Sequence, residues 1–261
     1  MLYIVGFVVS LIPNLALFFW LRSLEGDEGF KGICNKALTQ GMFCTLPVLG
    51  CSLVLFLLEF ALSRIGFSGI PKAAYHSFFV LAFSEELVKY LWFRKTLKQF
   101  NRAWSWMDYI ILMSIVGLGF GLLENVAVAI GSNIIVMLIR GLTMGHAGYG
   151  FIMGYFMGKA EKTGNRLWSV IGFVLPWILH GLYDFGLSNE LLALGDYTAI
   201  LAVGLAAVSA ITIIVLIVFM LRKRRDKKFL EPLHPTAALE REHDQPAPIE
   251  APDRQPKHFQ P

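Results

Sequence analysis

The sequence predicts an all-α protein: a bundle of about seven transmembrane helices, followed by a disordered tail. Of its 261 residues 56% are hydrophobic, and the mean hydropathy is +0.58, whereas soluble domains are about 45–50% apolar. Each of seven apolar runs reaches or approaches the ~20 residues that a membrane-spanning helix needs. They cover residues 1–22, 41–63, 73–93, 106–130, 134–158, 167–188 and 198–221.

The first run has neither a basic leader nor a small-residue cleavage site, which predicts a retained helix rather than a signal peptide. Cys34, Cys44 and Cys51 form no metal-ligand pair and no convincing disulfide set. We interpret them as apolar packing residues or free thiols.

The connections between the runs predict the orientation of the chain. Basic residues gather in segments 22–40, 94–105, 159–166 and 222–228, which hold 16 Lys and Arg, against two in the other connections. Because cytoplasmic loops are enriched in Lys and Arg, we expect the N-terminus outside and the C-terminus inside. This use of the net charge of +4 indicates membrane topology rather than nucleic-acid binding.

The tail, residues 229–261, is rich in Pro, acidic residues and His and poor in apolar residues, so it is predicted to be disordered and cytoplasmic. We interpret its histidines, His234, His243 and His258, as solvated rather than metal-binding.

The third run carries Glu85, Glu86 and Lys89. Each ionisable residue costs roughly 2.5–3.5 kcal/mol at the centre of a membrane helix, so such residues are functional candidates. At 100° per residue, Lys89 projects about 40° from Glu85 and about 60° from Glu86. This angle predicts that Lys89 pairs with Glu85 and leaves Glu86 free as a general base. The alternative is a neutralised structural ion pair, which does not account for the second glutamate.

Runs four and five carry Glu124, Asn125, Arg140 and His146, beside glycines at four-residue spacing that favour close helix packing. Glu124 and Arg140 lie symmetrically about the turn at 131–133, roughly 9 Å below the outer end of each helix. We expect them to pair, because an unpaired charge at that depth is costly.

The sixth run places His180 and Asp184 on one helical face. A carboxylate beside a histidine fixes the imidazole tautomer and raises its basicity. At 1.5 Å per residue, these side chains and those of runs three to five could converge near the membrane midplane.

Such a set suits hydrolysis inside a bilayer. Glu86 could act as general base on a water, with His146 and His180 around it. An HExxH zincin motif is absent from the sequence, so a metal would need ligands from separate helices. The candidates for such ligands are Glu86, His146 and His180.

Four motifs in order resemble the PrsW family of intramembrane proteases, related to type II CAAX prenyl proteases. They are Glu85-Glu86-x-x-Lys89, Gly119-Phe120 through Glu124-Asn125, Arg140 with His146, and His180-x-x-x-Asp184.

This resemblance covers about residues 75–188 and implies one protease domain over 1–228. The implied catalytic residues are Glu85, Glu86, His180, His146 and Glu124, supported by Lys89, Asn125, Arg140 and Asp184. The family implies a site-one cut in a membrane-anchored anti-sigma factor, in a bacterial cytoplasmic membrane. It leaves open whether glutamate alone or a divalent metal such as zinc activates the water.

Two other functions are compatible with these buried charges. A proton- or ion-coupled transporter also uses Glu, His and Lys on adjacent helices, although the sequence shows no paired inverted repeat. A non-enzymatic scaffold or sensor would tolerate neutral substitution at Glu85, Glu86 and His180 together.

Overall fold

The computed structural model describes residues 2–24, 27–100, 102–129, 137, 141 and 144–233. The described residues form helices, with no β-strand among them. The helices are α1 (Leu2–Ser23), α2 (Glu28–Phe43), α3 (Thr45–Ser63), α4 (Gly69–Tyr75), η1 (His76–Phe83), α5 (Ser84–Leu97), α6 (Trp106–Ala129), α8 (Gly145–Thr163), α9 (Leu167–Gly186), α10 (Asn189–Leu192), α11 (Asp196–Lys223) and α12 (Lys227–Leu230).

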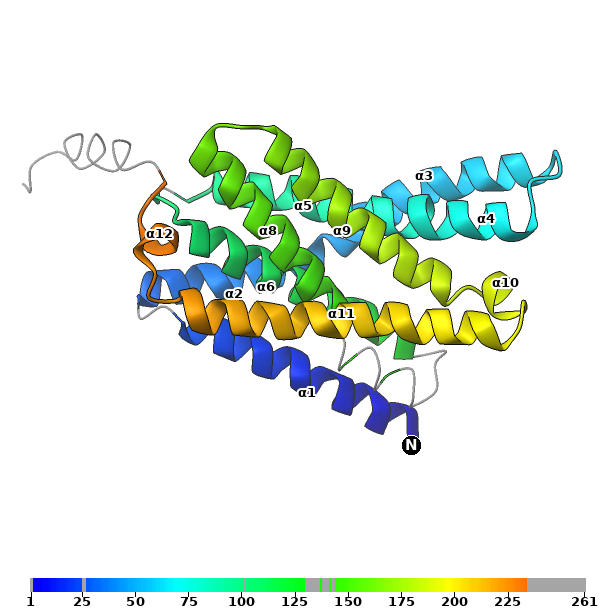
Figure 1. Cartoon of the computed structure of the whole chain (residues 1–261), viewed down its shortest axis with the longest axis horizontal. Helices are drawn as coiled ribbons and strands as arrows, with labels where there is room; N and C mark the ends of the chain where they lie inside the picture. Colours follow the sequence, from blue (N-terminus) through cyan, green and yellow to red (C-terminus); the bar gives the residue numbers. More distant parts are fainter. Residues whose placement is uncertain are drawn as a thin grey trace, which may run out of the picture.

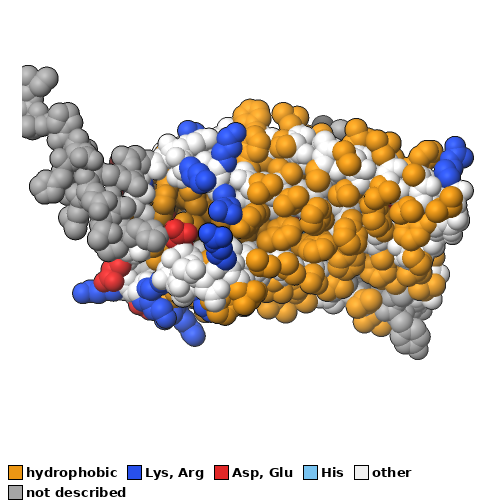
Figure 2. Space-filling view, turned by 90° about the horizontal axis from the view of Figure 1, so that it is seen from above, with side chains coloured by type: hydrophobic (Ala, Val, Ile, Leu, Met, Phe, Trp, Pro, Cys, Tyr) orange, Lys and Arg blue, Asp and Glu red, His pale blue; other side chains and the backbone are white. Residues whose placement is uncertain are grey.

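The long helices run back and forth along the long axis of the molecule (Figure 1). The connections α1–α2, α5–α6 and α8–α9 lie at one end together with α12, and the connections α3–α4 and α9–α11 lie at the other. Lys and Arg side chains gather toward the first end, beside a long apolar surface (Figure 2). We call the first end the basic end.

Helix α6 is the centre of the bundle. Within its apolar stretch Trp106–Val126, 94% of an 18-residue segment is buried, and the helix packs against α1, α2 and α8. Three stretches in the described part are long and apolar enough to cross a membrane: Glu28–Ser63, Trp106–Val126 and Leu167–Gly186. The predicted all-helical class is therefore confirmed, while the count of seven spans stays a prediction.

The prediction that residues 22–40 form a connection is wrong for most of that segment, because α2 begins at Glu28. Its position on the cytoplasmic side stays a prediction. Asp27 caps the helix by accepting hydrogen bonds from the backbone amides of Gly29 and Phe30. The Arg102 guanidinium, 2.7 Å from Asp27, holds the pKa of that carboxyl below its usual value. The buried face of α2 packs on α6 and consists of Phe30, Ile33, Cys34, Ala37 and Gly41.

The predicted third run is one helical path, Gly69–Leu97, whose middle part is the π-helix η1. A π-helix is rare and is frequently found at functional sites. Two contacts dock it on α9: Trp177 Nε1 donates to the Phe78 carbonyl at 2.6 Å, and the Phe78 ring lies against Gly181. The glutamates of α5 are therefore held in register with α9.

The fifth run is predicted as a helix over 134–158, whereas α8 begins at Gly145 and most of residues 130–143 lie outside the described residues. Helix α8 runs antiparallel to α6 in close contact. A Cβ added to Gly150 would overlap the carbonyl oxygen of Met113, and one added to Gly154 would overlap that of Tyr109. The glycines thus let the two backbones touch.

We expect Gly154→Ala to lower the free energy of unfolding by about 1–3 kcal/mol, because a methyl group against backbone cannot be accommodated by a side-chain rotation. Thermal unfolding of the purified protein in detergent measures it. The control is Gly50→Ala in α3, where an added Cβ meets nothing within 4 Å; it should be neutral or stabilising. Equal unfolding temperatures for the two variants would contradict the close packing of α6 and α8.

The tail is predicted to be disordered from residue 229, but its first residues are folded. Phe229 of α12 is buried, with its ring centroid 4.6 Å from that of Trp106. The Leu233 amide donates to the Trp104 carbonyl at 2.9 Å. Phe229 is thus an apolar residue in a polar segment that packs on the bundle through Trp106. Residues 234–261, with His234, His243 and His258, lie outside the described residues, and their disorder stays a prediction.

Candidate active site

Helix α5 presents Glu85, Glu86 and Lys89 to the inside of the bundle, at 8%, 1% and 1% exposure. Lys89 Nζ lies 2.6 Å from Glu86 Oε1 and 3.7 Å from Glu85 Oε2. The expectation that Lys89 pairs more closely with Glu85 is therefore wrong. A lysine side chain leans toward the N-terminus of its helix and reaches residues three and four positions back equally well. The other contacts of Lys89 therefore determine which glutamate it pairs with.

Two of those other partners come from α6 and α8. The ammonium lies 4.5 Å from the ring centroid of Phe120, a cation–π distance. It also lies 3.2 Å from His146 Nδ1. Lys89 thus links the glutamate pair of α5 to the histidine of α8.

His180 of α9 stands between two carboxylates. Its Nδ1 lies 2.9 Å from Glu86 Oε1, and its Nε2 lies 3.3 Å from Asp184 Oδ2. His180 is only 4% exposed. The Tyr149 ring stacks on the imidazole with a centroid distance of 4.9 Å and an interplanar angle of 22°. The imidazole is fixed from both edges and from one face.

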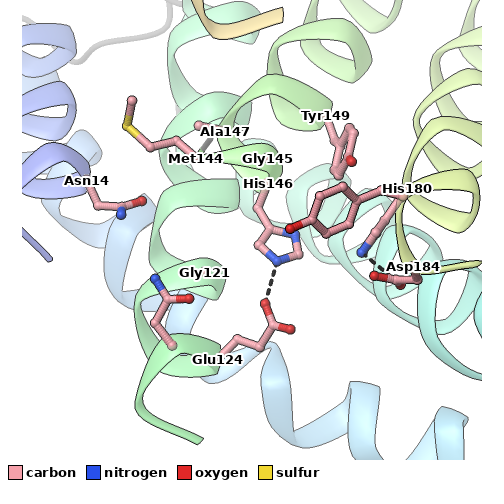
Figure 3. A pocket seen from close by; sticks show the side chains of 12 residues that line it. Asn14, Gly121, Glu124, Met144, Gly145, His146, Ala147, Tyr149, His180 and Asp184 are labelled. Carbon is pink, nitrogen blue, oxygen red and sulfur yellow. Dashed lines mark hydrogen bonds and ion pairs between the residues drawn. The ribbon is translucent and has the colours of Figure 1, made fainter. Parts of the chain in front are cut away.

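His146 of α8 completes the set. Its Nε2 lies 2.5 Å from Glu124 Oε2 of α6 (Figure 3). Arg140 lies outside the described residues, so its predicted pairing with Glu124 stays a prediction. The described acidic, histidine and lysine residues of the four motifs thus meet at one place, although they are separated by up to 99 positions along the chain. Gly119 of the second motif lies instead at the contact with α2.

The meeting point has the donor chemistry of a metal site. One atom each from Glu85, Glu86, His146 and His180 lies within 4.8 Å of every other. The Oε2 atoms of Glu85 and Glu86 are buried and have no hydrogen-bond partner among the described residues. A buried carboxylate oxygen without a partner is costly, and imidazole with carboxylate is a common ligand set for zinc. The residues therefore fit a divalent ion.

A pocket lies beside this cluster, between α1, α6, α8 and α9 (Figure 3). About 30 Å³ of it is open to water-sized molecules, which is room for one or two waters. Its walls include three polar residues that the sequence motifs do not reveal: Asn14, Tyr149 and Tyr183. Tyr149 and Tyr183 each follow a motif histidine by three positions, a spacing that shares its helical face. Asn14 is a buried polar residue in an apolar helix, which is itself a signal.

Lys89→Met should destabilise the protein by about 3–5 kcal/mol, because it leaves the Glu86 carboxylate buried without its cation. Thermal unfolding in detergent is the measurement. The double variant Glu86→Gln/Lys89→Met removes both charges and should recover most of the loss. If Lys89→Met unfolds at the wild-type temperature, the ion pair does not hold the site together.

Comparison with known proteins points to one family. The model of a family described as PrsW family intramembrane metalloprotease matches residues 33–221. A protein named Protease PrsW from Halalkalibacterium halodurans is 31% identical over 184 residues, which covers 67% of this chain and 80% of that protein. The protein of the same name from Bacillus subtilis is 27% identical over 185 residues, covering 67% and 79%. No solved structure matches.

Proposed function

We propose that this chain, which belongs to the PrsW family of intramembrane metalloproteases, makes the first cut in a single-span regulatory protein of the anti-sigma factor class. The chain is a membrane protein and an intramembrane protease by its family and its apolar helices. The substrate class rests on the family resemblance of its motifs. Family membership also favours the protease over the transporter and the scaffold.

The observation that best supports this function is a pair of buried glutamates with unpartnered oxygens, beside a water-sized pocket and two histidines. Glu85 Oε2 lies 3.9 Å from His146 Nδ1 and 3.9 Å from His180 Nε2. A single water can bridge polar atoms at such a separation. One water could therefore contact the carboxylate and both histidines.

We assign the role of general base to Glu85 rather than to Glu86. Glu86 is engaged through Oε1 by both Lys89 and His180, which makes it a positioning residue that orients His180. Glu85 has no bond of comparable length, so its carboxylate is the one available to take a proton from water.

The proposed reaction is addition of that water to the scissile peptide carbonyl. Glu85 takes the water proton and returns it to the leaving nitrogen. In the reaction without a metal, His180 is oriented by Glu86 through Nδ1 and donates from Nε2 to the oxyanion, which replaces Asp184 as the partner of that nitrogen. His146, held by Glu124, faces the same water. When bound, a zinc ion held by Glu86 Oε2, His146 and His180 would lower the pKa of its water and polarise the carbonyl.

We further propose seven spans in a bacterial cytoplasmic membrane, with the N-terminus outside and the basic end in the cytoplasm. Helices α1 and α11, of 22 and 28 residues, are long enough to cross as well. Accessibility labelling in intact cells checks this orientation, with Ser68→Cys or Thr163→Cys as the single cysteine of a cysteine-free variant; both residues are exposed. The Ser68→Cys variant should react and the Thr163→Cys variant should not; the reverse pattern would overturn the orientation.

The activity is tested with the purified protein in proteoliposomes together with tagged single-span anti-sigma factors. The wild type should produce two fragments, and a strong chelator should stop the reaction. The matched control is Glu190→Gln, a carboxylate-to-amide change in the exposed connection after α9, which should cleave at the wild-type rate. Cleavage that persists in both Glu85→Gln and Glu86→Gln would refute the proposed site.

A further inference from the structure

A second polar pocket of about 290 Å³ lies at the basic end, away from the glutamate and histidine cluster. Its polar and aromatic walls are Arg94, Lys98, Trp104, Tyr109, Glu161 and Ser169. Arg94 follows Glu86 by eight residues on α5, about 12 Å along the helix. The proposed catalytic chemistry makes no use of this pocket.

The pocket is lined by both basic and acidic side chains. Arg94 of α5 and Lys98, the residue that follows α5, have no carboxylate within ion-pair distance in the described part of the chain. Arg94 makes a 3.5 Å hydrogen bond to the hydroxyl of Tyr90, and its guanidinium lies 5.8 Å from the centroid of that ring. Glu161 of α8 is a further lining residue. Two cationic groups and one anionic group therefore border the same cavity.

The pocket opens where the apolar surface of the bundle begins. Leu91 is 54% exposed one turn before Arg94, and Val170, next to Ser169, is also 54% exposed. Lys and Arg side chains border the apolar surface at this end (Figure 2). Trp104 is half-buried in the wall, and tryptophan is enriched at the membrane–water interface. A ligand in this pocket can therefore extend an apolar part into the bilayer.

We propose that this pocket binds the headgroup of a membrane phospholipid that carries both a phosphate and a primary amine, as phosphatidylethanolamine does. Arg94 and Lys98 bind the phosphate, Glu161 binds the amine, and the acyl chains lie along Leu91 and Val170. A bare anion fits less well, because Glu161 would repel it.

A lipid held here would brace two functional helices. Tyr90 of α5 donates a hydrogen bond to Ser169 of α9 at 3.3 Å, and its ring lies 5.9 Å from that of Phe173. The headgroup would add a bridge from α5 to α8, because Glu161 lies on α8. Helix α5 carries the glutamates, α8 carries His146 and α9 carries His180, so the two links together would stabilise the juxtaposition of these groups.

The test uses the delipidated full-length protein in detergent, with thermal unfolding and native mass spectrometry as readouts. Phosphatidylethanolamine should raise the unfolding temperature and stay bound, more than phosphatidylcholine or phosphatidylglycerol. Arg94→Gln/Lys98→Gln should weaken that binding about 30-fold, since each basic residue near a lipid surface contributes a factor of about five. Glu161→Gln should remove the preference over phosphatidylglycerol.

Three results would overturn the proposal. The control Lys36→Gln/Lys95→Gln removes two charges from the same end outside the pocket, and an equal loss in this variant would mean unspecific attraction. An equal effect of phosphatidylcholine would mean that the amine is not recognised. An equal shift with soluble glycerophosphoethanolamine would mean that the site binds a soluble phosphodiester rather than a lipid. None of these readouts depends on proteolysis.

Discussion

Glu85→Gln is expected to lower the cleavage rate by about 10²–10⁴-fold, the usual contribution of a general base, without loss of stability. The amide keeps the shape of the side chain but cannot take a proton from water. Because Glu85 lies 3.7 Å or more from every ionic partner described here, its charge is not needed to hold the helices. Initial rates on a tagged substrate and thermal unfolding of the same preparation give both quantities.

Glu86→Gln is the matched comparison, since it makes the same chemical change one residue away. It should lose activity and stability together, because Glu86 Oε1 accepts from Lys89 at 2.6 Å and lies 2.9 Å from His180 Nδ1. If Glu86→Gln were stable but inactive and Glu85→Gln were unstable, Glu86 would be the general base and Glu85 the positioning residue. The two variants therefore distinguish the base from the positioning residue, which the order of residues along the helix does not.

His180→Ala should abolish cleavage and lower bound zinc from about one ion per chain to none. Removal of one of three protein ligands leaves a site that is too weak to hold the metal. Elemental analysis of the purified protein counts the metal independently of any substrate. If water activation needs no metal, His180→Ala instead removes a hydrogen-bond donor to the oxyanion, a loss of about 10²–10³ in rate.

His76→Ala serves as the control for that experiment. His76 lies outside the cluster, with its Nδ1 2.8 Å from Glu59 Oε2, so its variant should keep both metal and activity. A fully active wild type without bound metal, unaffected by chelator, would assign water activation to glutamate alone. Zinc retained in His180→Ala would remove His180 from the set of ligands.

The sequence predicts the charged residues of the site well, because charge inside a membrane is costly and is rarely present without a role. Glu85, Glu86, His146 and His180 stand out for this reason, and the structure brings them within 4.8 Å of one another. Their roles are not predictable to the same degree. The partner of Lys89 depends on Phe120 and His146, which lie on other helices. The angles between residues of one helix do not include these contacts.

The remaining misses have physical causes as well. Helix α2 contains Asn, Gln and three glycines, so its hydropathy resembles a loop, yet its small residues let it pack tightly on α6. Gly41 and Gly119 lie at that contact, where an added Cβ on either would overlap backbone of the other helix. Such a contact is a property of two surfaces, and one segment alone does not reveal it. The role of Tyr149 is not predictable from the sequence, because only the folded structure shows that its ring stacks on His180.

The π-helix η1 has a consequence for how this chain tolerates insertions and deletions. A π turn holds about one residue more than an α turn, so His76–Phe83 contains surplus length just before Glu85 and Glu86. Loss of one residue from this segment would let it relax into an ordinary α-helix without breaking the chain. The carboxylates would then keep roughly their present orientation toward His180, because the shorter α turn covers about the same rotation as the π turn. The same deletion in a regular α-helix would rotate every later side chain by about 100°. A one-residue deletion within His76–Phe83 is therefore expected to disturb Glu85 and Glu86 less than one in an ordinary helix would.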